Sequence, residues 1–187
     1  MVSDNRANAR LFWPLAAGVV TLDAITKWLA VRALVPMYTP REVMGEWFRL
    51  TLVYNKCAAF GMCVGPYSRW IFLVLTLVAL AVLARLYRTT RAENQLRALA
   101  LALVCGGAIG NLIDRLRHDM GVVDFLDLGV GDWRWPTFNI ADVAVSVGAF
   151  LLAWALWGEE ETGEPELAPA PLPVPTLTRV VKSGHGD

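Results

Sequence analysis

Cysteine and histidine are scarce in this chain of 187 residues, which contains three Cys and two His. So few cysteines give neither a disulfide framework nor the paired spacing of a zinc site. Cys57 and Cys63 are close enough in sequence to pair, but we expect two free, small apolar residues. His118 and His185 do not form an HExxH motif, and neither lies in an apolar run. A zinc protease and a Ser–His–Asp triad are therefore not indicated.

Charge is also sparse, since charged residues make up 18% of the chain and the net charge is zero. Nothing in this balance suggests a nucleic-acid partner. The sequence contains neither a Walker A motif nor a GxGxxG motif, so nucleotide chemistry has no support. In contrast, 56% of the residues are hydrophobic, above the usual share of about 45–50%, and the mean hydropathy is +0.44. This composition is typical of a membrane protein.

Four apolar runs have the length of a membrane-spanning helix, which needs about 20 residues. They cover Leu11–Leu34, Trp70–Tyr87, Leu96–Ile113 and Phe138–Trp157. The first run extends too far for a signal peptide and no clear cleavage site follows it, so we interpret it as a retained span. The sequence thus predicts an α-helical integral membrane protein with four transmembrane helices in residues 1–157. Residues 158–187 are rich in Pro and Glu and predict a disordered cytoplasmic tail.

The loops predict an orientation and a small β-structure. Arginines cluster in the short connection between the second and third runs, which places that connection and both termini in the cytoplasm. The two longer loops, about residues 35–69 and 114–137, then lie on the outer face. Residues 46–55 mix aromatic and β-branched residues with partial alternation, which indicates one or two strands in the first of these loops.

Most of the unusual polar residues converge on this outer face. The third run ends on the side of the membrane where the fourth begins, so the polar residues at these two ends share one membrane level. Both outer loops lie on the same side. The residues concerned are Lys27, Asn55, Asn111, Asp114, Arg115, Asp124, Asn139 and Asp142. Ionisable groups at this depth are costly and mark functional sites.

Individual residues also have structural interpretations. Asp23 and Lys27 are four apart on one helix, so an ion pair that shields both charges from lipid is favoured over catalysis. Asn139 can cap the fourth helix and leave Asp142 in its first turn. Asp119, Asp127 and Asp132 are expected to be solvated loop acids. The capping interpretation explains the position of Asp142 but not the cluster around it.

Paired aspartates are the chemistry that this inventory allows. Two carboxylates close together do not readily both ionise, so one keeps a proton. The charged carboxylate can deprotonate a water molecule while the neutral one polarises a scissile carbonyl group. Such a site needs no cofactor and no metal. Several Asp residues are candidates, and their spacing alone does not select the pair.

Five segments in this order resemble motifs of one family, the bacterial lipoprotein signal peptidases (signal peptidase II). The segments are Asp23-x-x-x-Lys27, the Asn-x-Gly-Ala-Ala-Phe-like box at residues 55–61, and residues 107–115, 121–125 and 138–142. The resemblance implies that Asp124 and Asp142 form a catalytic dyad. It also implies positioning roles for Asn55, Asn111, Arg115 and Asn139, and supporting roles for Asp114, Asp23 and Lys27.

The resemblance further implies an aspartic endopeptidase of the bacterial inner membrane with its active site at the extracytoplasmic face. Its expected partners are prolipoproteins, cut before a diacylglyceryl-modified cysteine, and membrane lipids; a monomer is expected. Cys57 stands where the family box has Gly, which carries a steric cost if that position has a positive φ. A small transporter or proton-relay protein is the alternative. Against it, the sequence has no inverted repeat, and its polar residues do not trace a path across the membrane.

Overall fold

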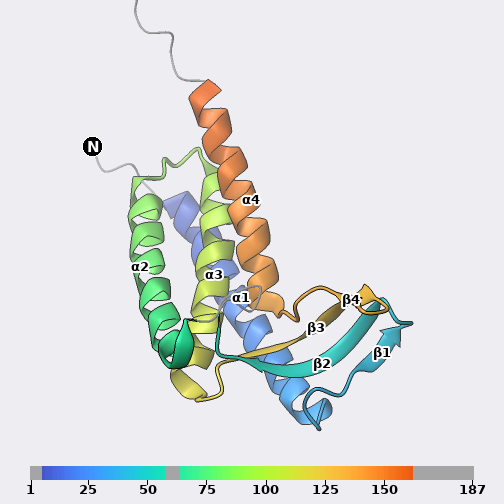
Figure 1. Cartoon of the computed structure of the whole chain (residues 1–187). Coiled ribbons are helices and arrows are strands. Elements are labelled where there is room, and N and C mark those ends of the chain that lie inside the picture. Colours follow the sequence, from blue (N-terminus) through green and yellow to red (C-terminus); the bar gives the residue numbers. More distant parts are fainter. Residues whose placement is uncertain (1–5, 58–63, 162–187) are drawn as a thin grey trace, which may run out of the picture.

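A computed structural model describes residues 6–57 and 64–161 of the chain. Four long helices run side by side in a bundle (Figure 1): α1 (Arg6–Ala33), α2 (Ser68–Thr89), α3 (Gln95–Arg117) and α4 (Ile140–Glu161). All four are long and apolar enough to cross a membrane, so the four predicted spans are confirmed. The single-turn helix η2 (Gly65–Tyr67) precedes α2.

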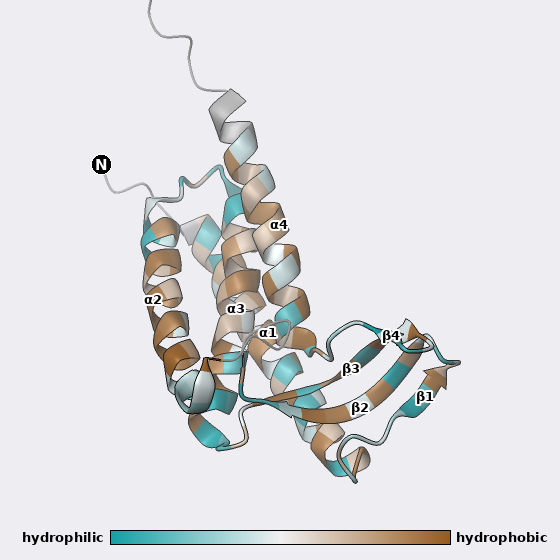
Figure 2. Cartoon of the chain, viewed as in Figure 1, coloured by the Kyte–Doolittle hydropathy of each residue, from teal (hydrophilic) through white to brown (hydrophobic). Residues whose placement is uncertain are grey.

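Apolar residues predominate along the helices of the bundle (Figure 2), and many of the large ones are exposed. Large side chains such as Trp28, Leu77, Phe150 and Trp154 are about half exposed or more. In water such a surface would be unfavourable, but lipid chains solvate it, and the helices satisfy their own backbone hydrogen bonds. The bundle is therefore built for a bilayer.

Helix α3 lies at the centre of the bundle and contacts α1, α2 and α4. Small residues allow this close approach, as is common between membrane helices. A Cβ atom at Gly107 would lie 2.3 Å from the main-chain oxygen of Ala141 in α4, and one at Gly106 would lie 2.9 Å from that of Ala16 in α1. The glycines thus let the middle of α3 lie close against both neighbours.

A four-stranded antiparallel sheet projects sideways from one end of the bundle (Figure 1). Its order is β1 (Arg41–Met44), β2 (Phe48–Asn55), β3 (Val122–Val130) and β4 (Trp133–Arg134). The strand expected within residues 46–55 is present as β2, whereas β1 precedes that segment. Strands β3 and β4 were not expected from the sequence, and Asp124 lies on β3 and not in an irregular loop.

The sheet packs against the end of α1 through an apolar cluster. Ala30 of α1 and Leu34, which directly follows α1, cluster with Leu52 of β2 and with Val123 and Phe125 of β3, all of them buried. Strand side chains alternate between the two faces of a sheet, so burying Val123 and Phe125 against α1 turns Asp124, which lies between them, to the other face. The packing of apolar neighbours thus sets the direction of this carboxylate.

Asp127 corrects one prediction, because it is buried and not solvated. Its carboxylate accepts hydrogen bonds from Thr51 Oγ1 (2.8 Å) and from Arg134 Nε (2.9 Å) and Nη2 (2.6 Å). The ion pair joins β3 to the short β4, and the hydrogen bond from Thr51 adds β2. An acid in a loop is more often exposed, and the sequence carries no sign that β3 runs through this segment.

Helix α4 continues to Glu161, beyond Trp157, where the predicted membrane domain ends. The part of α4 that is long and apolar enough to span a membrane covers Ile140–Trp157. Residues 162–187 lie outside the described residues, so disorder of the tail stays a prediction.

Candidate active site

Strand pairing brings Asn55 to Asp124. In the register of β2 and β3, Asn55 is opposite Val122, which makes Asp124 its diagonal neighbour on the same face of the sheet. Asn55 Nδ2 donates a hydrogen bond to Asp124 Oδ2 at 3.1 Å. Asn55 is itself held by the N–H group of Cys57, which donates to Asn55 Oδ1 at 2.9 Å.

Asn139 both caps α4 and contacts the candidate site. Its Oδ1 accepts the Asp142 N–H group at 2.9 Å, while the Asn139 N–H group donates to Asp142 Oδ2 at 3.1 Å, which is a reciprocal capping box. Its Nδ2 donates to Asp124 Oδ1 at 2.7 Å and to Asn111 Oδ1 at 3.1 Å. The capping interpretation is therefore correct, and the same fully buried side chain also links both aspartates.

Asn111 links Asp142 to a buried charge. Its Nδ2 donates to Asp142 Oδ1 at 2.7 Å, and its Oδ1 accepts a hydrogen bond from Lys27 Nζ at 2.9 Å. Lys27 also pairs with Asp23 (2.7 Å) and Asp114 (2.9 Å). The ion pair expected between Asp23 and Lys27 is present, and Asp114 joins it.

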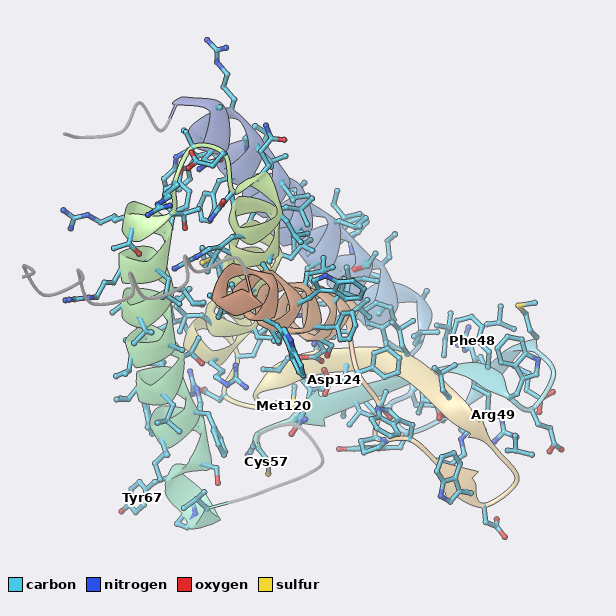
Figure 3. All side chains as sticks on the ribbon, turned by 90° about the horizontal axis from the view of Figure 1, so that it is seen from above. Phe48, Arg49, Cys57, Tyr67, Met120 and Asp124 are labelled. Atoms are coloured by element: carbon cyan, nitrogen blue, oxygen red, sulfur yellow. The ribbon has the colours of Figure 1, made fainter. Side chains whose placement is uncertain are left out.

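Asp124 and Asp142 line one cavity of about 360 Å³ at the end of the bundle next to the sheet. Asn55, Asn111 and Arg115 also line it. Figure 3 shows the labelled Asp124 where the sheet passes the end of α4. The structure thus brings the expected site residues together in two groups. The first lines the cavity and is joined by the buried Asn139. The second is the ion-paired group of Asp23, Lys27 and Asp114, which contacts the first through Asn111.

Burial and charge tune the carboxyl group of Asp124. Asp124 is 2% exposed. Loss of hydration, together with the neighbouring charge of Asp142, raises its pKa from 3.8 to about 7. Hydrogen bonds from Asn55 and Asn139 and the charge of Lys27 act in the opposite direction. A carboxyl group with this pKa can donate a proton near neutral pH.

Arg115 provides positive charge at the cavity wall. Its guanidinium group interacts electrostatically with Asp142, Asp124 and Asp114, in that order of strength, and its Nη1 donates to the main-chain oxygen of Asn111 at 3.3 Å. Paired carboxylates with amide and guanidinium donors can activate a water molecule and polarise a carbonyl group. Within residues 6–57 and 64–161, no group of three or more His, Cys, Asp or Glu side chains is arranged to bind a metal ion.

Cys57 departs from expectation in two respects. It is disulfide-bonded, so the expected free thiol is wrong for this residue; Cys63 lies outside the described residues. Its backbone is unstrained, since Tyr38 is the non-glycine residue with positive φ in the described part of the chain. The steric cost considered for a side chain at this position therefore does not arise.

The apolar walls of the cavity were not predicted from the sequence. They include Trp135, Phe138, Val143 and Val147. The position of Asp142 could have indicated the part of the wall that α4 forms, because residues about one helical turn after it lie on the same helix face. Val145 and Ser146 do line the same cavity. Apolar residues in an apolar run otherwise give no sign that they face a cavity.

The fold and this site define a four-span membrane protein with two carboxylates facing a single cavity at one end of its bundle. Residues 15–158 match the model of the family described as Signal peptidase (SPase) II, and the chain belongs to this family. It is 41% identical over 151 residues to the lipoprotein signal peptidase of Nitratidesulfovibrio vulgaris (strain DP4), covering 79% of this chain and 90% of the relative.

Further relatives agree. The chain is 43% identical over 152 residues to the lipoprotein signal peptidase of Syntrophotalea carbinolica, covering 81% of this chain and 93% of that protein. A bacterial membrane enzyme solved at 2.3 Å by the in meso method has a similar fold, with a TM-score of 0.71 and 29% identity over 82% of this chain and 92% of its own.

Proposed function

We propose that this protein is an aspartic endopeptidase of the bacterial inner membrane, which removes signal peptides from prolipoproteins by cleaving before the diacylglyceryl-modified cysteine. Removal of these signal peptides is the activity of the family to which the chain belongs. The observation that carries the aspartic mechanism is the pair Asp124 and Asp142, which line one cavity and are bridged by the side chain of Asn139.

In this mechanism the two carboxyl groups share one proton. The raised pKa of Asp124 assigns the proton to Asp124, which donates a hydrogen bond to the scissile carbonyl oxygen. Asp142 takes a proton from a water molecule, whose oxygen forms a bond to the carbonyl carbon. The tetrahedral intermediate collapses as the C–N bond breaks, and the proton gained by Asp142 passes to the leaving amine.

The surrounding groups fix this geometry. Asn55 and Asn139 each donate to one oxygen of Asp124, while Asn111 donates to Asp142. Arg115 adds positive charge that stabilises the developing oxyanion. Donors that are already oriented need no rearrangement during the reaction, so these residues act by positioning and by electrostatics.

We propose that both termini face the cytoplasm and that the cavity opens toward the outer leaflet. The clustered arginines between α2 and α3 favour this orientation. The cavity wall formed by α4 includes Val143 and Val147, which are both exposed, so a lipid-modified substrate can enter sideways from the membrane. The enzyme is proposed to act as a monomer among membrane lipids. The transporter alternative is not favoured, since the chain belongs to a peptidase family.

The test is cleavage of a purified diacylglyceryl prolipoprotein by the enzyme in detergent, with the products identified by mass spectrometry. We expect one cut, immediately before the lipid-modified cysteine. Asp124→Asn and Asp142→Asn should each lower kcat by about 10²–10⁴-fold, which is the usual contribution of a general acid or base. Asp132→Asn is the matched control, because Asp132 is exposed and outside the cavity. Normal activity of either cavity variant would refute the dyad.

A further inference from the structure

A buried group of three charges lies beneath the proposed dyad, and we call it the ionic trio: Lys27, Asp23 and Asp114. Lys27 Nζ is 2.7 Å from Asp23 Oδ2, 2.9 Å from Asp114 Oδ2 and 2.9 Å from Asn111 Oδ1. An ammonium group has three donors, so these contacts use all of them. Each trio residue is at least nine-tenths buried.

The two carboxylates of the trio also bind main chain, and the sites that they bind are informative. Asp23 Oδ1 accepts the N–H group of Ala141 at 2.9 Å. Asp114 Oδ2 accepts the N–H group of Val123 at 3.1 Å. Ala141 directly precedes Asp142, and Val123 directly precedes Asp124. Each carboxylate therefore fixes the peptide unit one residue before one member of the proposed dyad.

The packing of α3 makes room for this arrangement. A Cβ atom at Gly110 would lie 2.6 Å from Asp23 Oδ2 and 3.3 Å from the Cβ atom of Ala141. Glycine at this position thus lets the Asp23 carboxylate reach the first turn of α4. Without that reach, Asp23 and Lys27 would still form an ordinary ion pair along α1, but the pair would not contact α4.

We propose that the ionic trio is a positioning unit that sets the separation of the two catalytic carboxyl groups. Lys27 joins two carboxylates, and each of these holds the backbone just before one dyad aspartate. This proposal rests on the proposed function. The side chains of the dyad are oriented by amides, and the trio adds an independent restraint on their backbones. Reacting groups displaced by about 1 Å can lose about 10²-fold in rate.

The trio also sets the local charge, because two carboxylates and one ammonium leave one excess negative charge. The charge of Lys27 lowers the pKa of Asp124. Lys27 of α1 and Arg115 of α3 act electrostatically on the dyad, and β2 presents the neutral Asn55. Asp23 of α1 and Asp114 of α3 bind the backbone next to the dyad. Removing a positive charge and removing a negative charge from the trio must therefore move the pH profile in opposite directions.

The experiment measures kcat, KM and the pH dependence of kcat/KM for Asp23→Asn and Lys27→Met with the prolipoprotein substrate. Asp23→Asn leaves Lys27 paired with Asp114, so this variant is expected to fold. We expect kcat to fall by at least about tenfold, as for a displaced reacting group, with KM within about threefold. The profile should move to lower pH in Asp23→Asn and to higher pH in Lys27→Met.

Asp127→Asn is the matched control, since Asp127 is equally buried and ion-paired but does not contact the backbone before either dyad residue. It should lower Tm while kcat is retained. An unchanged kcat and an unshifted profile in Asp23→Asn would overturn the proposal, even if Lys27→Met does not fold. This result is distinct from failure of the proposed function, in which Asp124→Asn or Asp142→Asn would remain active.

Discussion

Asp124→Asn should stabilise the protein while abolishing catalysis. The pKa of Asp124 rises from 3.8 to about 7 on folding, mainly because burial removes water from the carboxylate. The folded state therefore binds more protons than the unfolded state between these values. The stability that the protonated Asp124 contributes is fully present below about pH 4 and is lost as the pH rises through 7. Above pH 7 the folded state contains a buried carboxylate next to Asp142.

The magnitude follows from the shift. One pKa unit corresponds to about 1.36 kcal/mol, so ionising Asp124 costs the folded state roughly 4 kcal/mol. The amide in Asp124→Asn avoids this cost. It also places a donor against Asn55 or Asn139, whose Nδ2 groups both donate to Asp124, and one lost hydrogen bond costs about 1 kcal/mol. We expect a net gain of roughly 2–3 kcal/mol at pH 8 and a small loss at pH 4.

The assay is thermal unfolding of purified wild type and Asp124→Asn in one detergent between pH 4 and pH 8. Asp132→Asn, at an exposed position, controls for the general effect of removing a charge. We expect the difference in Tm between Asp124→Asn and wild type to grow with pH. A constant difference, or one that shrinks with rising pH, would refute the assigned burial of a neutral Asp124.

Two further substitutions test the framework. Asn139→Ala removes the cap of α4 and an amide that binds Asp124, so we expect a loss of about 2–4 kcal/mol in unfolding free energy and no cleavage; wild-type Tm would contradict this. Gly107→Ala places a Cβ atom 2.3 Å from the main-chain oxygen of Ala141, so α3 and α4 must separate. We expect about 1–3 kcal/mol of destabilisation and reduced kcat, measured by unfolding and cleavage; Gly18→Ala, with open space around it in the interior of α1, should lower neither stability nor kcat.

Hydropathy and topology predicted much of this molecule. The four spans follow from run length, because a bilayer imposes one length on every helix that crosses it. The convergence of Asn111 and Asp142 follows from the antiparallel order of α3 and α4, and their side chains are hydrogen-bonded. These features depend on local sequence and on chain order, so they can be inferred without coordinates.

Other features depend on long-range pairing that the local sequence does not encode. Strand β3 exists because it pairs with β2, 69 residues away at the contact between Asn55 and Asp124. Burial of Asp127 follows from the same pairing, since Thr51 and Arg134 reach it from other strands. The contacts of Asp23 and Asp114 with the backbone before each dyad residue likewise require the packed bundle. The sequence indicated the ion pair of Asp23 with Lys27 but not the backbone groups that Asp23 and Asp114 bind.

The most direct test of the two-aspartate mechanism is single-turnover cleavage of a diacylglyceryl prolipoprotein by enzyme reconstituted in lipid vesicles, with wild type, Asp124→Asn and Asp142→Asn compared side by side. We predict that both variants remain folded and bind the precursor, while the rate of cleavage falls by at least about 10²-fold in each. Cleavage by either variant at a rate close to that of the wild type would contradict a mechanism that uses both aspartates.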